Sequence, residues 1–409
     1  MTIEAPPIER KAIRAANPAR RVTILGSTGS IGVNTLDLVR QERGSYRVAA
    51  LTARSRWREL ADQAREFGPE FVAIEDEAHF ADLKSALSGL DVEVGAGASA
   101  MKEAAALDAD WVMAAIVGAA GLAPTLEAAR RGATIALANK ECLVCAGDIF
   151  LREAERYGAT LLPVDSEHNA IFQVLDSSRP ETVEKLILTA SGGPFRAASF
   201  DTMKAATPEQ AVAHPRWQMG RKISVDSATM MNKGLEVIEA AYLFDMQPER
   251  IEVLVHPESV VHSLVAYIDG SVLAQLGTPD MRTPIAYSLA WPTRMPTPSK
   301  RLDLAATGKL TFEAPDPQRF PALELARECL QQGGGIPTVM NAANEVAVQA
   351  FLDRRIGFLD IVTLVRRAVE DMSDNLARAM PSRIEDIWAL DDEARRRATE
   401  IVTKSSPRA

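Results

Sequence analysis

The chain has 409 residues, of which 47% are hydrophobic and 25% charged, with a formal net charge of −9 at pH 7. This balance is typical of a globular protein with two or three domains, and it argues against a nucleic-acid-binding protein, which normally carries a basic face. No uninterrupted apolar run reaches the ~20 residues of a membrane-spanning helix, so we expect no membrane contact. Three cysteines are too few for a disulfide framework and favour a reducing compartment, so a cytoplasmic location is expected.

Residues 1–18 combine acidic residues with three prolines and no apolar core, which predicts a disordered tail rather than a targeting peptide. Residues 19–164 then alternate short β-branched runs with segments of helical periodicity. This alternation predicts a doubly wound, Rossmann-like parallel sheet. The predicted strands are Val22–Leu25, Val48–Leu51, Phe71–Ile74, Trp111–Ala114, Thr134–Leu137 and Thr160–Leu162.

The first strand leads into the glycine-rich turn Gly26-Ser27-Thr28-Gly29-Ser30-Ile31-Gly32. Its spacing, G-x-x-G-x-x-G, is a variant of the fingerprint that lets backbone N–H groups and a helix N-terminus approach a pyrophosphate. After the second strand, Arg54-Ser55-Arg56 stands where an NAD site would carry an acid, so NADPH is favoured over NADH. The alternative is that Arg56 and Arg58 only solvate a helix start.

The Cys142-x-x-Cys145 pair resembles half of a redox or zinc motif, but no second pair accompanies it. We interpret these cysteines as two small buried residues at a helix start.

Asp165 and Glu167 follow the apolar run Thr160–Leu162. If that strand continues, both carboxylates project to one face, because side chains alternate along a strand. Two neighbouring acids repel each other unless a cation neutralises them, so this spacing predicts a site for Mg²⁺ or Mn²⁺. The site would lie where the nucleotide-binding domain ends, at residue 164.

Ser191-Gly192-Gly193 follows a predicted strand and is a candidate phosphate cradle. Residues 191–221 are predicted to form a lid loop in which Trp217 closes over a ligand, the alternative being a buried tryptophan in an irregular connection. Further on, Asn232, Lys233 and Glu236 fall within one turn of a predicted helix. Glu236 would be a third carboxylate for the metal, whereas a surface ion pair between Lys233 and Glu236 is the simpler interpretation.

The strands Ile251–Val255, Val260–Ile268 and Val272–Leu276, with a hairpin at Asp269–Ser271, predict a second sheet, mixed or antiparallel. It would belong to a central α+β catalytic domain spanning residues 165–290. A proline-rich linker over 291–316, a C-terminal helical bundle over 317–403 and a polar tail over 404–409 complete the prediction.

Six of these motifs, in this order, resemble the 1-deoxy-D-xylulose 5-phosphate reductoisomerase family. They are Gly26–Gly32, Asn139–Glu141, Val164–Asn169, Ser191–Phe195, His214–Gly220 and Asp226–Glu236, and the match extends from about Arg21 to the end of the chain. The resemblance implies an NADPH-dependent and divalent-metal-dependent oxidoreductase and isomerase of isoprene biosynthesis. Such an enzyme rearranges and reduces 1-deoxy-D-xylulose 5-phosphate to 2-C-methyl-D-erythritol 4-phosphate, and the family forms homodimers through its second sheet.

The resemblance also implies roles for individual residues, with Lys140, Glu167 and His214 as the catalytic candidates. It implies a metal site of Asp165, Glu167 and Glu236. The implied cofactor-binding residues are Gly26, Thr28, Gly29, Ser30, Ile31, Arg54, Ser55, Arg56, Asn139, Glu141 and Gly220, with the triplet 54–56 matched only by position because the family often has Gly-Lys-Asn there. The implied substrate-binding residues are Lys140, Ser166, Glu167, Ser191, His214, Trp217, Ser227, Asn232, Lys233 and Glu236, with Ser259 and Met281 nearby.

Two other functions compete with this interpretation. A plain NADP-dependent dehydrogenase of the semialdehyde or homoserine type would reduce its substrate without rearranging it. A non-catalytic NADPH sensor would need neither the three carboxylates nor Lys233, so their presence disfavours it.

Overall fold

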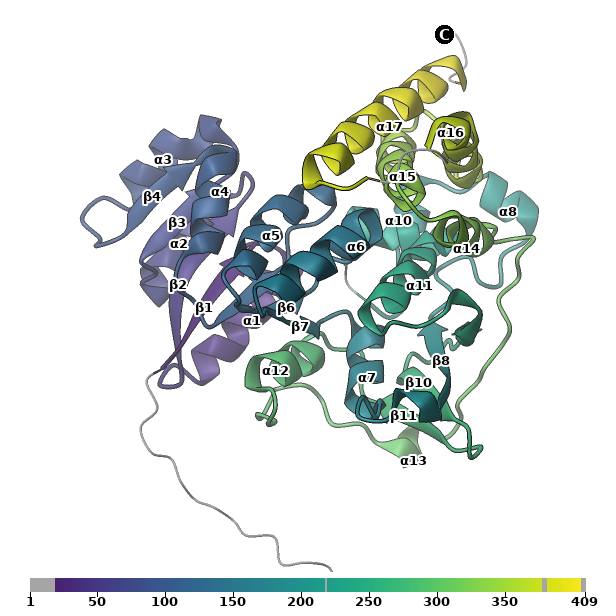
Figure 1. Cartoon of the computed structure of the whole chain (residues 1–409), viewed down its shortest axis with the longest axis horizontal. Helices are drawn as coiled ribbons and strands as arrows, with labels where there is room; N and C mark the ends of the chain where they lie inside the picture. The colour runs from purple at the N-terminus through teal and green to yellow at the C-terminus, as the bar shows by residue number, and fades with distance from the viewer. Residues whose placement is uncertain (1–18, 218, 377–380, 406–409) are drawn as a thin grey trace, which may run out of the picture.

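The structure is a computed structural model that describes residues 19–217, 219–376 and 381–405. The predicted tail 1–18 and residues 406–409 lie outside this range. The N-terminal part is a seven-stranded parallel sheet in the order β4-β3-β2-β1-β5-β6-β7, which confirms the Rossmann-like prediction (Figure 1). The strands are β1 (Arg20–Leu25), β2 (Tyr46–Ala53), β3 (Phe71–Ile74), β4 (Glu93–Ala96), β5 (Trp111–Ala114), β6 (Thr134–Leu137) and β7 (Thr160–Pro163).

Helices cover both faces of this sheet, because its strands are apolar on both sides. One face packs against α1 (Ser30–Gln41), α2 (Trp57–Phe67) and α3 (Phe80–Ala86), and the other against α4 (Gly97–Ala106), α5 (Leu122–Arg130) and α6 (Glu141–Arg156). A later helix, α12 (Arg282–Ala290), also joins the first face through Ile285, Ala286 and Leu289. The sequence prediction had grouped this helix with the catalytic region.

Strand β4 was missed by the sequence prediction. It is a four-residue edge strand, Glu93-Val94-Gly95-Ala96, with no fully buried residue. Short edge strands lack the continuous apolar run that marks the central strands of a parallel sheet, so their sequence signal is weak.

The second sheet is mixed, in the order β11-β10-β8-β9. Its strands β8 and β9 are parallel, whereas β10 pairs antiparallel with both β8 and β11. The four strands are β8 (Val183–Ala190), β9 (Ile251–Val255), β10 (Val261–Tyr267) and β11 (Val272–Leu276), so the predicted hairpin joins β10 and β11. This arrangement agrees with the predicted α+β region.

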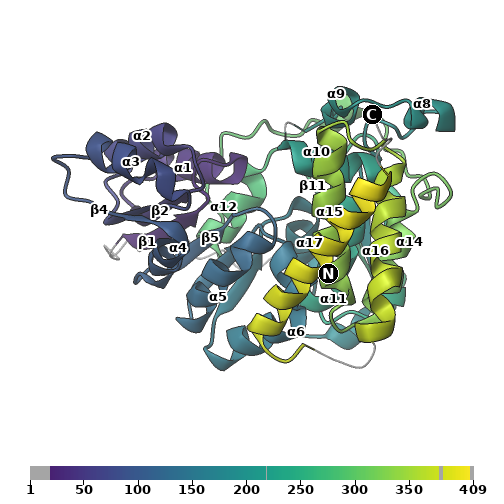
Figure 2. The ribbon, with the colours of Figure 1, turned by 90° about the horizontal axis from the view of Figure 1, so that it is seen from above.

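The remaining helices surround this sheet and continue into a C-terminal bundle (Figures 1 and 2). The helices are α7 (Ser166–Val174), α8 (Phe200–Lys204), α9 (Pro208–Val212), α10 (Arg221–Thr229), α11 (Met231–Leu243), α13 (Leu304–Thr307), α14 (Ala322–Gln332), α15 (Ile336–Leu352), α16 (Asp360–Leu376) and α17 (Ile384–Ser405), with 3₁₀ turns η1 (Glu77–His79), η2 (Ala119–Gly121), η3 (Pro180–Thr182) and η4 (Pro248–Arg250).

One apolar core joins the second sheet to α11 and to the helices α14–α17, so the sheet and the bundle stabilise each other. The predicted linker contains α13, and α17 runs to Ser405, two residues beyond the predicted end of the bundle at 403.

Among the described residues, no helix combines the length and the apolar character that crossing a membrane requires.

Candidate active site

The glycine-rich turn lies between β1 and α1, at the carboxyl edge of the parallel sheet. Gly26 has φ +83°, and a Cβ there would lie 2.8 Å from the carbonyl oxygen of Ala115 in the loop after β5. A Cβ at Gly32 would collide with the backbone of Ser27, so this glycine allows α1 to pack closely on the turn. The strand order reverses between β1 and β5, and dinucleotides bind at such a switch point. The turn therefore has the geometry of a dinucleotide cradle.

The residues expected to contact the cofactor lie along this carboxyl edge. Thr28, Gly29, Ser30 and Ile31 lead from the turn into α1, for which Gly29 is the N-cap. Arg54, Ser55 and Arg56 follow β2 and are exposed, which leaves their side chains free to meet a phosphate. Arg58 instead lies over the ring of Trp57, 4.3 Å from the centroid.

Asn139, Lys140 and Glu141 follow β6 on the same edge, and all three are buried. Glu141 is at the start of α6 and pairs with Lys222 of α10 at 3.0 Å. Cys142 and Cys145 are free thiols buried in α6, as the sequence predicts. Gly220, the last expected cofactor contact, is the exposed N-cap of α10.

Asp165 and Glu167 do not lie on a strand, so the strand-face explanation for their proximity was wrong. β7 ends at Pro163, Asp165 is the N-cap of α7, and Glu167 is in the first turn of that helix. The side chain of Asp165 accepts a hydrogen bond from the backbone N–H of Glu167 at 3.3 Å. Acidic residues are favoured at a helix N-terminus by its free N–H groups and dipole, which explains why two carboxylates are tolerated here.

Glu236 completes a three-carboxylate cluster from α11. One oxygen from each of Asp165, Glu167 and Glu236 lies within 4.8 Å of the others. All donors are oxygens, which are the ligands that Mg²⁺ and Mn²⁺ prefer, and Glu236 is only 1% exposed. The residues therefore fit a hard divalent cation.

Two lysines neutralise the cluster. The Nζ atom of Lys140 donates to Asp165 at 2.6 Å and to Glu236 at 3.1 Å, and also to the side-chain oxygen of Asn232 at 2.9 Å. Lys233 bonds Glu167 at 2.8 Å and also pairs with Glu236. The pairing of Lys233 with Glu236 is thus present, but it is buried rather than a surface ion pair.

Burial and the neighbouring charges shift the pKa values of Glu167 and Asp165 in opposite directions. Burial and the neighbouring Glu236 raise the pKa of Glu167 to about 7. Burial also disfavours the ionised form of Asp165, but Lys140 outweighs it and holds the pKa of that carboxyl well below its usual value. Lys140, although buried, keeps its proton because Asp165 and Glu236 raise its pKa well above the usual value. Glu167 therefore titrates near neutral pH, whereas Asp165 stays ionised.

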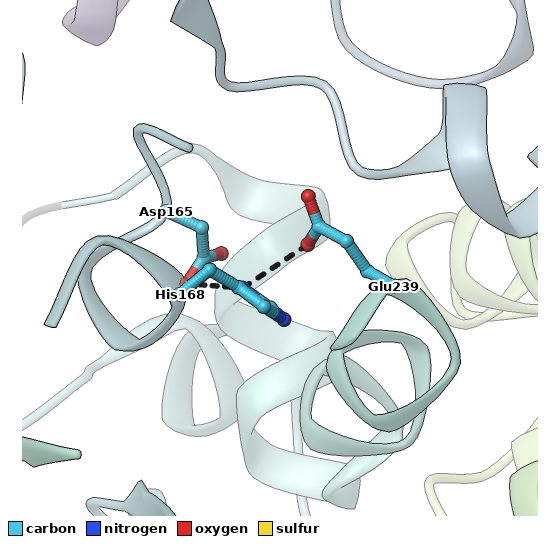
Figure 3. Close-up of side chains that lie close together, drawn as sticks. All are labelled: Asp165, His168 and Glu239. Atoms are coloured by element: carbon cyan, nitrogen blue, oxygen red, sulfur yellow. Dashed lines mark ion pairs between the residues drawn. The ribbon is translucent and has the colours of Figure 1, made fainter. Parts of the chain in front are cut away.

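His168 and Glu239 lie behind the cluster, and the sequence reasoning missed both. The ring Nδ1 of His168 is 3.4 Å from an oxygen of Asp165 and 3.2 Å from one of Glu239 (Figure 3). The ring Nε2 is 2.9 Å from the carbonyl oxygen of Glu236. Asp165, His168 and Glu239 could by spacing form a second metal group. Burial disfavours the charged ring, but Glu239 and Asp165 outweigh it and raise the pKa of His168 to about 9, so without a bound ion the ring is protonated near neutral pH, which disfavours its use as a metal ligand. In the sequence, His168 follows Asp165 by three residues and Glu239 follows Glu236 by three. This helical spacing was the signal that could have identified both residues.

The predicted lid residues meet the second sheet beside this cluster. His214 accepts hydrogen bonds at Nδ1 from the backbone N–H groups of Arg216 and Trp217, at 3.2 and 2.9 Å. Its Nε2 therefore carries the proton and donates to Ser191 Oγ, 2.8 Å away. Burial lowers the pKa of His214, which keeps the ring neutral. His214 is thus a hydrogen-bond donor on the site's rim.

The glycine turn after Ser191 packs closely on α10. Gly193 has φ +66°, and a Cβ there would lie 2.8 Å from the carbonyl oxygen of Ser227. The predicted phosphate cradle, Ser191-Gly192-Gly193, therefore packs against Ser227. The sequence alone does not reveal this contact.

A small, partly open pocket lies next to the carboxylate cluster at Ser166. Trp217 lines it and is half-buried, with its ring 6.2 Å from that of His262. Burial lowers the pKa of His262 to about 4, so this ring is neutral. Trp217 is therefore neither fully buried nor free, and a half-buried ring over a pocket is what a lid residue requires. The lining also includes Asn169, Gln173, Gln275, Asp280, Thr283 and Pro284.

Lys222 is a further residue that the sequence reasoning missed. It bridges Glu141 of α6 and Asp226 of its own helix, both at 3.0 Å. Asp226 in turn accepts from Asn344 of α15 at 2.8 Å. The spacing of Lys222 and Asp226 was visible in the sequence, whereas the contact with Glu141 arises only from the fold.

The parallel sheet is of the dinucleotide-binding type, and its carboxyl edge carries a carboxylate cluster that fits a divalent cation. Together these two features define a metal-dependent oxidoreductase of the dinucleotide-binding class. Family models identify the family within this class. The model described as 1-deoxy-D-xylulose 5-phosphate reductoisomerase matches residues 22–147, and two models of its C-terminal domains match residues 161–244 and 276–397. The chain belongs to the 1-deoxy-D-xylulose 5-phosphate reductoisomerase family, which confirms the resemblance seen in the motifs.

Relatives of that name are similar over nearly the whole chain. The protein of Rhodospirillum centenum is 61% identical over 383 residues, covering 94% of this chain and 94% of its own length. The protein of Caulobacter vibrioides is 57% identical over 397 residues, covering 97% of this chain and 100% of its own length.

Solved structures of the same family share the fold. The enzyme from Zymomonas mobilis in complex with NADPH has a TM-score of 0.88 at 53% identity and covers 94% of this chain and 99% of its own. A reductoisomerase in complex with NADPH, fosmidomycin and magnesium has a TM-score of 0.92 at 45% identity, covering 95% and 100%.

Proposed function

We propose that this chain is an NADPH-dependent reductoisomerase that converts 1-deoxy-D-xylulose 5-phosphate to 2-C-methyl-D-erythritol 4-phosphate in non-mevalonate isoprenoid precursor synthesis. The observation that carries the proposal is the carboxylate cluster of Asp165, Glu167 and Glu236 at the edge of a dinucleotide-type sheet. Family membership supports it, as do the solved relatives in complex with NADPH and with magnesium. A plain dehydrogenase would not require this cluster.

Asp165, Glu167 and Glu236 would hold one Mg²⁺ or Mn²⁺. A divalent ion supplies Lewis-acid stabilisation of the negative charge that develops on substrate oxygens. The protein's part is to present three carboxylates in a buried setting and to hold Lys140 against two of them. As an ammonium donor, Lys140 can also orient a substrate oxygen, and Glu167, whose pKa is about 7 without a bound metal, would give up its proton on ligating the ion.

NADPH would lie across the switch point on the glycine-rich turn and supply the hydride. Arg54, Ser55 and Arg56 are proposed to bind its 2′-phosphate, which is supported by their exposure after β2 and by the absence of an acid there. The other proposed cofactor contacts are Gly26, Thr28, Gly29, Ser30, Ile31, Asn139, Glu141 and Gly220.

The substrate would lie between the lid and α11. Ser191, Ser227, Asn232 and Lys233 are proposed to surround its phosphate, which is supported by the close approach of Gly193 to Ser227. Ser166, His214 and Trp217 would contact the remaining part of the substrate, with Trp217 excluding water from the pocket.

The test is to incubate the protein with 1-deoxy-D-xylulose 5-phosphate, NADPH and Mn²⁺, and to follow both NADPH absorbance and the carbon skeleton of the product. We expect NADPH oxidation with formation of the branched product, and slower oxidation with NADH in its place. Oxidation without the branched product would favour the plain dehydrogenase. NADPH binding without any oxidation would favour the sensor.

Metal affinity should depend on pH through Glu167. Because its pKa is about 7, a proton occupies this ligand at lower pH and competes with the cation. We expect Mn²⁺ to bind more tightly as the pH rises to about 7 and to level off above it, with affinity about tenfold lower for each pH unit below. Isothermal titration calorimetry between pH 5.5 and 8 measures this. Glu167→Gln is the control and should bind weakly without this pH dependence; equal wild-type affinity across the range would contradict the assignment.

A homodimer is proposed across the β11 edge of the second sheet. Ile268, Val272 and Leu273 are apolar yet 68%, 51% and 49% exposed, and in the described part of the chain β11 has a neighbouring strand on one side only. An exposed apolar edge strand is a surface that a second copy of the chain can cover. Light scattering after gel filtration should give the mass of a dimer for the wild type. Leu273→Lys should lower the measured mass toward that of the monomer. Leu90→Lys, at another exposed leucine, is the matched control, and a monomeric wild type would refute the dimer.

A cytoplasmic location is also proposed, which is supported by the three free, buried cysteines.

A further inference from the structure

The loop after β5 lies against the glycine-rich turn, at the point where the strand order reverses. It runs from Ala115 to Gly121, and its first carbonyl lies so close to Gly26 of the glycine-rich turn that a Cβ there would be 2.8 Å away. Val117, in the same loop, is 69% exposed although apolar. Because dinucleotides bind at such a switch point, the position of this loop affects the contacts that a cofactor bound there can make.

Two side chains from different parts of the fold hold the loop. Asn139, at the end of β6, donates through Nδ2 to the carbonyl oxygens of Ile116 and of Gly118, the latter at 2.9 Å. Glu345, from α15 of the C-terminal bundle, approaches from the other side. Its Oε1 accepts from the backbone N–H of Ala119 at 3.4 Å, and a Cβ at Gly118 would lie 2.8 Å from the same oxygen. Gly118 has φ +77°, so both its backbone conformation and this contact favour glycine.

Glu345 is itself held in place by other bundle residues. Its Oε2 accepts from Arg395 of α17 at 2.6 Å, and Asn341, one turn earlier on α15, donates to Oε1 at 3.1 Å. Arg395 is also bound by Asp391 at 2.5 Å. The carboxylate is therefore a fixed acceptor at the start of η2 and α5, where a negative charge is favourable.

We propose that Glu345, oriented by Arg395, is a positioning residue that sets the loop 115–121 for NADPH and so makes the C-terminal bundle a contributor to cofactor affinity. This inference rests on the proposed NADPH site. The bundle is distant in sequence from the glycine-rich turn, yet α17 crosses toward α5 and α6 of the nucleotide-binding part (Figure 2). The metal cluster is held by other contacts, so the effect should be confined to the cofactor.

The experiment compares Glu345→Gln and Arg395→Met with wild type, using NADPH fluorescence for the dissociation constant and steady-state kinetics for kcat. Glu345→Gln keeps the size of the side chain but loses the charge that binds Arg395. If the loop then spends a tenth of its time in the competent position, NADPH binds about tenfold more weakly. We expect that loss in both variants, with kcat at saturating NADPH within about twofold of wild type and Mn²⁺ affinity unchanged. The double variant should be no weaker than the worse single one.

Arg396→Met is the matched control, since Arg396 is on the same helix and pairs only with Glu393 and Glu400 among the described residues. It should bind NADPH as wild type does. Unchanged NADPH affinity in folded Glu345→Gln and Arg395→Met would overturn the inference, as would equal losses of NADPH affinity, Mn²⁺ affinity and kcat. Failure of the wild type to bind NADPH would refute the proposed function instead.

Discussion

Glu236→Gln should abolish turnover and leave NADPH binding nearly intact. Glu236 is the most buried of the three carboxylates and the only one from α11, so its loss removes the ligand that joins the two sides of the cluster. The amide keeps the shape but not the charge that a hard cation needs. Loss of about 4 kcal/mol of transition-state stabilisation corresponds to a roughly thousandfold fall in kcat. Steady-state assays at high Mn²⁺ and fluorescence titration with NADPH measure the two effects.

The matched control for this change is Glu252→Gln, because Glu252 is also a paired carboxylate but lies on β9, 41% exposed, with Lys185 as its partner. It should retain wild-type kcat. If Glu236→Gln loses NADPH affinity as strongly as turnover, Glu236 is a structural residue. If it keeps most of its turnover, the metal is not held by this cluster.

The sequence predicted the parallel sheet and the glycine-rich turn because both have local causes. Continuous β-branched runs mark buried central strands, and the positive φ of Gly26 is a requirement of the turn itself. The weakly marked edge strand β4 and the packing of α12 against the first sheet depend on distant parts of the chain. No local pattern reveals that Leu289 lies in the same core as Val22.

The sequence identified the residues of the candidate site but not how they are arranged in space. Asp165 and Glu167 were placed together for the wrong reason, since an N-cap and a first helical turn, rather than a strand face, bring them together. Glu236 was found because helical spacing makes it a neighbour of Lys233. The central position of Lys140 could not be predicted, because its three partners come from α7 and α11, far along the chain.

Lys140→Met should destabilise the protein strongly, and a divalent cation should restore part of that stability. The ammonium group of Lys140 is the shared partner of Asp165 and Glu236, and the three side chains are 7%, 11% and 1% exposed. Removing one partner of a buried ion pair leaves uncompensated charge, which typically costs about 3–5 kcal/mol. Mg²⁺ or Mn²⁺ bound to the same carboxylates replaces the missing positive charge and stabilises only the folded state. Urea unfolding with and without millimolar MgCl₂ measures both effects.

The variant's response to Mg²⁺ separates a local charge effect from a general packing defect. If the loss of stability comes from repulsion between Asp165 and Glu236, Lys140→Met should gain more stability from Mg²⁺ than wild type does, and adding Asp165→Asn should recover part of the loss without metal. The control is Lys185→Met, which removes a lysine that is 40% exposed and should change the free energy of unfolding by less than about 1 kcal/mol. A destabilised Lys140→Met that Mg²⁺ and Asp165→Asn both fail to restore would mean that the aliphatic stem of Lys140, rather than its charge, supports this part of the fold. Lys140 would then lose its proposed role in balancing the metal site.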